Sequence, residues 1–312
     1  MAAPQNPNVQ ALPQWRQWIQ QLYRPRYEAG PPPRSQWRDA WGRLLRNPLA
    51  VLGGVTILLL ALAAVLAPWI APYDPTAQDL TAINQAPSAV HWCGTDQLGR
   101  DIFSRLLWGA RISLSVGVFT QLLVLAIGLP IGALAGFFGG RVDSLLMRAT
   151  DVMYAFPDLL LVILFRAVFG PSIAMMFVAI ALASWVGLAR LTRGQFLSLK
   201  EREFVQAAHA LGATHGRIIL RHLLPNAAGP LIVLLTFAVP RAIFAEAALS
   251  YIGIGIAPPT PSWGSMIQEG SQAIFAAPWQ VFFPSIAIAT TMLAFTFLGD
   301  GLRDALDPRL TR

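Results

Sequence analysis

The chain alternates between long uncharged apolar stretches and short segments that carry most of its charges. Residues 49–70 hold no charged side chain, and neither do residues 112–140. At about 1.5 Å per helical residue the first stretch reaches roughly 33 Å, enough to cross the hydrocarbon core of a bilayer. Residues 231–251 and 282–298 are two further apolar stretches. The pattern predicts a chain that spans a membrane with helices.

Small residues mark the second stretch as a helix that packs closely on its neighbours. It contains Gly128, Gly132 and Gly136 at intervals of four, together with Pro130. Small side chains let the backbones of membrane helices approach one another. We therefore expect this span to lie inside the helix bundle.

The distribution of Lys and Arg orients the spans. Segments 1–48, 139–150, 190–226 and the tail after residue 302 hold 18 of the 23 basic residues, whereas the other connecting segments hold three. Cytoplasmic segments carry the excess of basic residues in membrane proteins. Because 139–150 and 190–226 both come out inside, two spans must lie between them, with an outer turn at 170–172. We expect six spans, with both termini in the cytoplasm.

Composition agrees with that topology and excludes several classes. The chain is 55% hydrophobic and 12% charged, which is half the charge of an average soluble domain. Its net charge of +7 is explained by the cytoplasmic segments, so we expect no nucleic-acid partner. The single cysteine, Cys93, cannot form an intrachain disulfide, and no motif for a metal or cofactor is present.

The N-terminal segment predicts a helix on the inner membrane surface. After Ser35, Trp37 and Trp41 alternate with Arg38 and Arg43, as in interfacial helices, and residues 15–22 repeat the pattern weakly. We expect an order of 1–48 as a cytoplasmic segment with this elbow helix, 49–71 as the first span, 72–110 as an external loop, 111–301 as a core of five spans, and 302–312 as a cytoplasmic tail.

The cytoplasmic loop 190–226 is the most specific part of the sequence. Phe204, Val205, Ala208 and Leu211 recur at helical spacing, which predicts an amphipathic helix over 202–211. Gly212 suits a left-handed cap at its end. The spacing predicts a helix–turn–helix in the cytoplasm.

The second half of this loop supplies its own signals. Thr214 is placed to cap a second short helix that runs to Leu223, and Pro225 either stops that helix or opens the next span. The small side chains of Ala207 and Ala208 allow close approach by a partner surface. Docking of another protein is therefore the favoured role of this loop.

Here the sequence resembles a known family. The loop is similar to the EAA loop of ABC-importer permeases, with Gln206-Ala207-Ala208, Gly212 and Leu224-Pro225 at the motif positions. Gln206 replaces the motif's acidic residue and His222 its isoleucine. Segments 91–117, 246–267 and 298–310 resemble the dipeptide, oligopeptide and nickel branch of this family, specifically its C-type subunit.

The resemblance implies an all-α integral membrane protein with the type I ABC-importer (MetI-like) permease fold, six transmembrane helices and cytoplasmic coupling helices. It implies a bacterial cytoplasmic-membrane location and three kinds of partner: a second, B-type permease subunit, cytoplasmic ABC ATPase subunits and an external solute-binding protein. The residues that it assigns to ATPase coupling are Arg202, Gln206, Ala207, Ala208, Gly212, Leu224 and Pro225.

The chain itself carries neither an ATP-binding motif nor a catalytic motif. A phosphate-binding P-loop needs a lysine after a glycine-rich turn, and the one lysine, Lys200, follows Phe-Leu-Ser-Leu. We therefore expect a transport subunit that is not an enzyme, with no catalytic residues and no cofactor. His209, His215 and His222 lie in the loop without metal-ligand spacing, so we expect contact with the ATPase or simple exposure.

Ionisable residues within the spans are candidates for function because each is costly in hydrocarbon. Asp151 and Asp158, seven apart, are expected to share one face of span three. Arg241 and Glu246 are five apart, poorly placed to pair with each other, and expected to pair across helices. Asp158, Arg241 and Glu246 are the candidates for the translocation path, with structural ion pairs as the alternative.

Near the outer start of span two, the cluster of His91, Cys93 and Asp96 has a metal site as one interpretation. The alternative is that Thr95 or Asp96 caps an amphipathic elbow helix in which Asp101 faces Arg105. The topology also predicts that Cys93 lies outside the membrane, open to reagents from outside unless a subunit contact buries it.

Two function classes remain open at this point. The first is an importer permease subunit for peptides or similar small solutes, or for nickel. The second is a stand-alone channel or secondary transporter, which would be expected to carry its own coupling residues and often an internal repeat. The sequence shows no such repeat and has a cytoplasmic platform that needs a partner. We therefore favour the importer permease.

Overall fold

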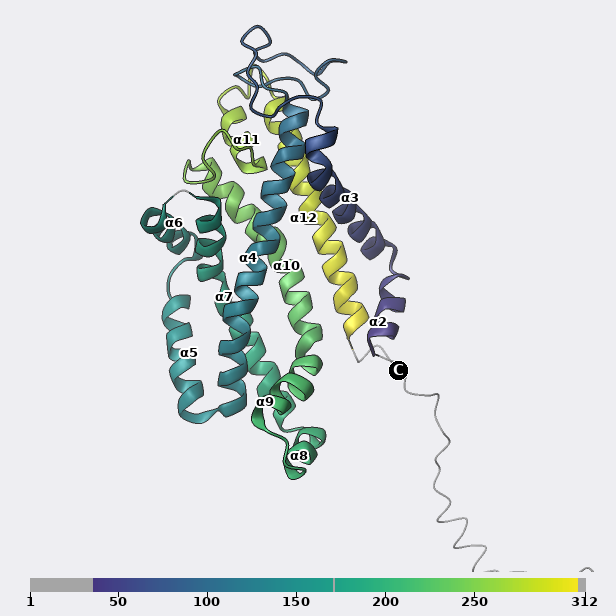
Figure 1. Ribbon diagram of the computed structural model, residues 1–312, viewed down its shortest axis with the longest axis vertical. Coiled ribbons are helices and arrows are strands. Elements are labelled where there is room, and N and C mark those ends of the chain that lie inside the picture. The colour runs from purple at the N-terminus through teal and green to yellow at the C-terminus, as the bar shows by residue number, and fades with distance from the viewer. Residues whose placement is uncertain (1–35, 171, 308–312) are drawn as a thin grey trace, which may run out of the picture. The chain divides into compact units, whose positions relative to one another are not determined.

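A computed structural model describes residues 36–170 and 172–307 of the chain. The weak 15–22 pattern lies outside these residues. A division of the chain by contacts falls between Asp39 and Ala40, inside helix α2, and the other features below belong to Ala40–Arg312. The helices, coloured along the chain in Figure 1, are α2 (Gln36–Leu44), α3 (Pro48–Ile70), α4 (Ile102–Phe138), α5 (Gly140–Tyr154), α6 (Asp158–Phe169), α7 (Ile173–Lys200), α8 (Glu203–Ala210), α9 (His215–Ile218), the π-helix η1 (Ile219–Leu223), α10 (Leu224–Tyr251), α11 (Trp263–Ser271) and α12 (Trp279–Leu306).

Five of the described helical segments are long and apolar enough to cross a membrane, and a bent pair of helices makes up to six. The first of them, α3, begins where capping chemistry directs. The Asn47 side chain accepts hydrogen bonds from the backbone N–H groups of Leu49 and Ala50, and Pro48 occupies the first turn, where its missing N–H costs nothing. The apolar pattern thus located α3 to within a residue or two.

The third predicted span is broken. Helices α5 and α6 meet at a bend of 88°. Pro157 precedes α6 in an extended conformation, and without an N–H it cannot continue the hydrogen-bond ladder of α5. The expectation that Asp151 and Asp158 share one helix face is therefore wrong, because they lie on two differently directed helices.

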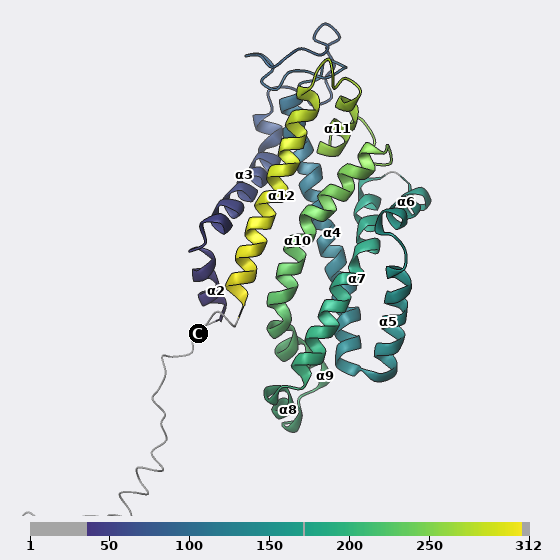
Figure 2. The ribbon, with the colours of Figure 1, turned by 180° about the vertical axis from the view of Figure 1, so that it is seen from behind.

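Helices α4 and α7 are in close backbone contact along the predicted glycine positions. A Cβ atom on Gly128, Gly132 or Gly136 would lie 2.8, 2.3 or 2.7 Å from a backbone carbonyl oxygen of α7. Figures 1 and 2 show the two helices side by side over the halves that lie nearer to α8. The predicted close packing of this span is confirmed.

The connection from α9 into α10 is continuous. The helical segment runs from His215 to Tyr251, with the single π-turn η1 inside it. Pro225 lies in the first turn of α10, and the backbone N–H of Leu224 bonds to the carbonyl of Ile219, five residues back. A wider turn of this kind accommodates a proline that has no N–H to donate. Pro225 therefore opens the span instead of stopping a separate helix.

Candidate coupling surface and membrane-embedded charges

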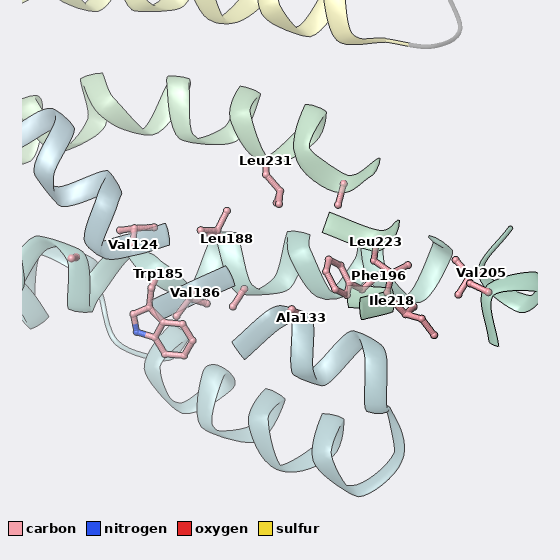
Figure 3. Close-up of a cluster of buried hydrophobic side chains, with 14 residues drawn as sticks. Val124, Ala133, Trp185, Val186, Leu188, Phe196, Val205, Ile218, Leu223 and Leu231 are labelled. Atoms are coloured by element: carbon pink, nitrogen blue, oxygen red, sulfur yellow. The ribbon is translucent and has the colours of Figure 1, made fainter. Parts of the chain in front are cut away.

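Helix α8 lies at the end of the molecule where α7 and α9 meet, joined to α7 by only Glu201 and Arg202. Its Val205 and Ala208 side chains are buried, with exposed fractions of 1% and 8%. Figure 3 shows Val205 beside Ile218 of α9, Leu223 of η1 and Phe196 of α7. The short helix is thus seated on a core formed by its neighbours.

The same cluster extends into the membrane-spanning part. It includes Val124 and Ala133 of α4, Leu188 of α7 and Leu231 of α10. Protein interiors pack at the density of organic crystals, so a displacement of one side chain is transmitted to the side chains that it contacts. A displacement of α8 would therefore shift α4, α7 and α10 together.

The outward surface of α8 differs from the one expected. Ala208 faces the protein's own core, whereas Ala207 is exposed. Phe204 and Leu211 were expected on the same apolar helix face as Val205 and Ala208, but they are 41% and 88% exposed. Val205 and Ala208, three residues apart, form the one side of this eight-residue helix that rests on the bundle, and the other apolar side chains are left outside. We call the exposed residues Phe204, Gln206, Ala207, Ala210 and Leu211 the outer face of α8.

The turn after α8 has the predicted left-handed glycine. Gly212 has φ +78°, its N–H bonds to the carbonyl of His209, and the N–H of Ala213 bonds to the carbonyl of Ala208. This pair of bonds defines a Schellman motif, which satisfies carbonyl groups at the helix end. Thr214 then caps α9 by accepting the N–H of Arg217. The turn predicted from glycine and threonine alone is confirmed.

The remaining coupling candidates occupy the two ends of the loop. Arg202 holds the N-cap position of α8, where it is exposed and makes no side-chain cap. The Gln206 amide donates to the carbonyl of Glu201, 3.2 Å away, a bond that a glutamate could not make when ionised. Leu224 packs on the core under α8, whereas Pro225 is exposed at the start of α10.

An aromatic group ties this turn to the end of α4. The rings of Phe137 and His209 are nearly parallel with centroids 6.4 Å apart, and His215 meets Phe137 and Phe138 edge-on at 5.4 and 5.9 Å. Aromatic pairs at such distances stabilise a contact beyond the area that they bury. The two histidines were expected only to touch a partner or solvent. The sequence contained a signal for this contact, the two phenylalanines at the end of an apolar stretch, but no role was predicted for them.

Glu246 is fully buried and bonded to hydroxyl groups from three segments. Its carboxylate oxygens lie 2.7 Å from the Oγ atoms of Ser250 and Ser262 and 3.4 Å from that of Ser113. Ser113 and Ser262 also accept backbone N–H groups, which leaves their own protons for the carboxyl. The expected ion pair across helices is therefore wrong for Glu246. With no exposed surface, Glu246 is an internal acceptor that joins α4, α10 and the start of α11.

Two other charges near the spans also have partners within the chain. Arg166, 4% exposed, donates to the backbone carbonyls of Ile254 and Gly255 and to two carbonyls at the turn before α7. Asp151 pairs with Arg190 of α7 at 2.7 Å. These contacts hold α6 and α5 against their neighbours.

Arg241 and Asp158 are different. Both are exposed, and neither makes a hydrogen bond or ion pair with a residue that the structure describes. Arg241 lies ten residues from each end of the apolar stretch 231–251. A charged side chain at the centre of a bilayer costs roughly 2.5–3.5 kcal/mol on insertion scales. The guanidinium group of Arg241 therefore needs a setting other than lipid.

The loop between α3 and α4, residues 71–101, was expected outside the membrane and is called the outer segment here. It is closed by ion pairs that sequence spacing did not predict. Asp101, not Thr95 or Asp96, caps α4 by accepting the N–H of Ser104, and it pairs with His91 at 2.9 Å. The expected pair of Asp101 with Arg105 is therefore wrong, since Asp101 already has these two partners.

Arg105 instead joins a cluster with Arg100, Asp96 and Glu269 of α11. Glu269 is the one charged residue in 252–280, which was the available signal. The cluster fastens α11 to the outer segment.

Cys93 lies in this outer segment but is buried, with an exposed fraction of 9%. Burial, with the nearby Asp101 carboxylate, raises the pKa of its thiol to about 11. The expectation that Cys93 is open to reagents from outside is therefore wrong.

Comparison with known proteins agrees with this arrangement. Residues 128–312 match the family described as binding-protein-dependent transport system inner membrane component, and residues 35–87 match the N-terminal transmembrane domain of oligopeptide transport permease C. Among solved structures, the inward-facing MetNI methionine ABC transporter matches with a TM-score of 0.53 and 18% identity, over 66% of this chain and 98% of that one. That likeness shows the fold.

Curated relatives are considerably more similar. The dipeptide transport system permease protein DppC of Bacillus subtilis (strain 168) is 48% identical over 90% of this chain and 88% of its own length. The oligopeptide permease protein OppC of the same organism is 45% identical over 89% of the chain and 91% of its own length. The glutathione permease protein GsiD of Pectobacterium atrosepticum is 44% identical, over 89% and 92%. The chain belongs to the family of ABC-importer permeases, as a multi-pass membrane subunit of the branch that includes these three proteins.

Proposed function

We propose that this permease subunit imports peptides or similar small solutes, and that the outer face of α8 receives the force of a cytoplasmic ATPase. A second, B-type permease subunit would form the other half of the path, and an external binding protein would deliver the cargo. ATP hydrolysis would belong to the ATPase partners. In this arrangement the membrane is the bacterial cytoplasmic membrane and both termini are cytoplasmic, as the distribution of basic residues favours.

The observation that carries the coupling role is the two-sided character of α8. Its inner face is seated on a core shared with α4, α7 and α10, while its outer face presents two alanines between the exposed apolar side chains of Phe204 and Leu211. An exposed apolar surface on a cytoplasmic element is typical of a protein contact site. Small side chains at its centre suit close approach by a groove.

The proposal of peptide cargo rests on the relatives and on the exposed charges. The three relatives named above are permeases for dipeptides, oligopeptides and glutathione. Of the three residues expected on the path, Glu246 has no exposed surface, which leaves Asp158 and the cationic Arg241. The exposed Arg241 guanidinium attracts the carboxylate of a peptide and the exposed Asp158 carboxylate attracts its ammonium group, whereas a bare divalent cation would be attracted by Asp158 and repelled by Arg241. Peptide cargo is therefore favoured over nickel.

Substitution of Ala207 tests the coupling role. Ala207→Glu places a charge in the middle of the outer face without touching the core, so we expect normal membrane insertion with loss of ATPase co-purification and of ATP hydrolysis stimulated by the loaded binding protein. Ala207→Ser is the matched control and should keep both, because serine is nearly as small. Measurements are made on the complex reconstituted in vesicles.

Ala208→Glu serves as a contrast, because it would place a charge in the chain's own core. We expect a lower yield of folded subunit for this variant, with any ATPase defect following from that loss. Wild-type stimulation and co-purification in Ala207→Glu would show that the outer face of α8 is not the coupling surface.

A further inference from the structure

Arg241 stands on a continuous exposed stripe of α10. Phe244 and Tyr251 are 58% and 57% exposed, and Ala248 between them is partly exposed. Positions 241, 244, 248 and 251 follow the three- and four-residue spacing of one helix face. The opposite side of α10 is buried, with Ala242, Ile243 and Leu249 at 3% exposed or less. The stripe is thus the face of α10 that this chain leaves uncovered at membrane depth.

A lone cation on such a face needs an anionic partner. Within the described residues Glu246, Arg166 and Asp151 are each satisfied by groups of the chain itself, whereas Arg241 is not. Glu246 cannot serve it, because serine hydroxyl groups hold both of its oxygens inside the core. No described residue of the chain therefore supplies the partner of Arg241, and a group that arrives from outside the chain is free to do so.

We propose that Arg241 binds the carboxylate group of the transported peptide at the middle of the path. This inference rests on the proposed function, since it names the chemical group of that cargo which the path recognises. A guanidinium presents a planar fork of donors that matches a carboxylate with two parallel hydrogen bonds. Phe244 and Tyr251 supply apolar surface on the same face, which suits peptide side chains of varied shape because aromatic contact is not specific to one residue type.

The binding has to be modest for transport to proceed. One exposed charge-assisted contact changes a binding constant by about ten- to a hundredfold, which is enough to favour a carboxylate over an uncharged end without trapping the cargo. Arg241 is thus a specificity-determining residue inside the membrane, acting after the selection that an external binding protein makes.

A comparison of two cargoes across a series of variants tests this assignment. The complete importer with its binding protein is reconstituted in vesicles, and uptake is measured for a labelled alanine dipeptide and for its C-terminal amide. For the free acid, uptake should fall in the order Arg241, Arg241→Lys, Arg241→Gln, Arg241→Glu. For the amide the four proteins should be nearly equal. The acid-to-amide ratio should drop about tenfold or more between wild type and Arg241→Gln.

The ratio isolates the permease because every variant receives cargo from the same binding protein, whose own preference cancels. The charge-reversed Arg241→Glu provides a second measurement on the acid alone, which requires no transport of the amide. Co-purification of the second permease subunit is measured for each variant and is expected to be unchanged.

Three results would overturn the assignment. Equal losses for acid and amide, with the complex intact, would show that Arg241 does not read the carboxylate. Loss of the second permease subunit from Arg241→Gln would show that Arg241 pairs across the subunit interface. Unchanged uptake in Arg241→Glu would exclude it from the path. Failure of the wild-type importer to carry either peptide would instead refute the proposed peptide cargo, and this inference with it.

Discussion

The contact between α4 and α7 allows a sharp test, because the chain contains its own control. A Cβ atom on Gly132 would lie 2.3 Å from the carbonyl oxygen of Ala189 and 2.6 Å from Cβ of Thr192. On Gly194, within the same helix pair, a Cβ atom would meet nothing within 4 Å. Both glycines are helical, so alanine gains about 1 kcal/mol of helix propensity at either site.

The difference between Gly132→Ala and Gly194→Ala therefore cancels the propensity gain and leaves the cost of overpacking. Ordinary contact begins at 3.4 Å, so the two backbones must separate by about 1 Å at Gly132. Forced repacking of this size costs typically 1–3 kcal/mol. We expect Gly132→Ala to be less stable than Gly194→Ala by about that amount.

Thermal unfolding of the purified complex in detergent, followed by the loss of its monodisperse peak, ranks the two variants against the wild type. The expected order is Gly194→Ala at or above the wild type and Gly132→Ala below it. If Gly132→Ala unfolds at the same temperature as Gly194→Ala, the reasoning that α4 and α7 are in backbone contact at Gly132 is wrong.

Three further predictions concern the outer segment, the orientation of the chain and the buried carboxyl group. With a thiol pKa of about 11, only about one Cys93 thiol in ten thousand is ionised at pH 7. A membrane-impermeant maleimide should therefore label Cys93 far more slowly than the cysteine of the control variant Ser88→Cys in a Cys93→Ala background. Equal labelling rates would contradict the burial of Cys93. In that background a cysteine at exposed Ser198 should react only after permeabilisation, and labelling from outside would overturn the proposed orientation. Glu246→Gln replaces an acceptor oxygen by a donor facing serine hydroxyl groups, so we expect a loss of about 1–3 kcal/mol in stability, measured as a lower unfolding temperature, and an unchanged temperature would refute the hydrogen-bond network.

Local chemistry made the start of α3 and the turn between α8 and α9 predictable. Gly212 could be assigned a left-handed conformation because its neighbours have the spacing of a helix end. Thr214 could be assigned as a helix cap because it precedes a new helix. The spans followed from the lengths of uncharged stretches, and the close contact of α4 from three glycines on one face. Each of these features depends on residues that are near one another in the sequence.

The features that sequence reasoning missed depend on distant residues. Phe204, Val205, Ala208 and Leu211 are all apolar, so periodicity could not tell which of them the bundle would cover. The partners of Glu246 come from three separate segments, and Glu269 meets an arginine 164 residues away. The bend of α5 against α6 was signalled by Pro157, but its angle depends on what the two helices pack against.

The way α8 is connected bears on how the two proposals fit together. On one side two residues join α8 to α7, which is in close contact with α4 along the glycine positions. On the other side a four-residue turn leads into the continuous helical segment from His215 to Tyr251. A push on the outer face of α8 therefore reaches α10 without an intervening flexible loop. Arg241 lies 17 residues beyond Leu224 on that helix, roughly 25 Å along its axis. A rotation of α10 driven from the cytoplasm would thus turn the Arg241 stripe toward or away from the cargo, so that ATP-dependent movement and release of the carboxylate would be one event.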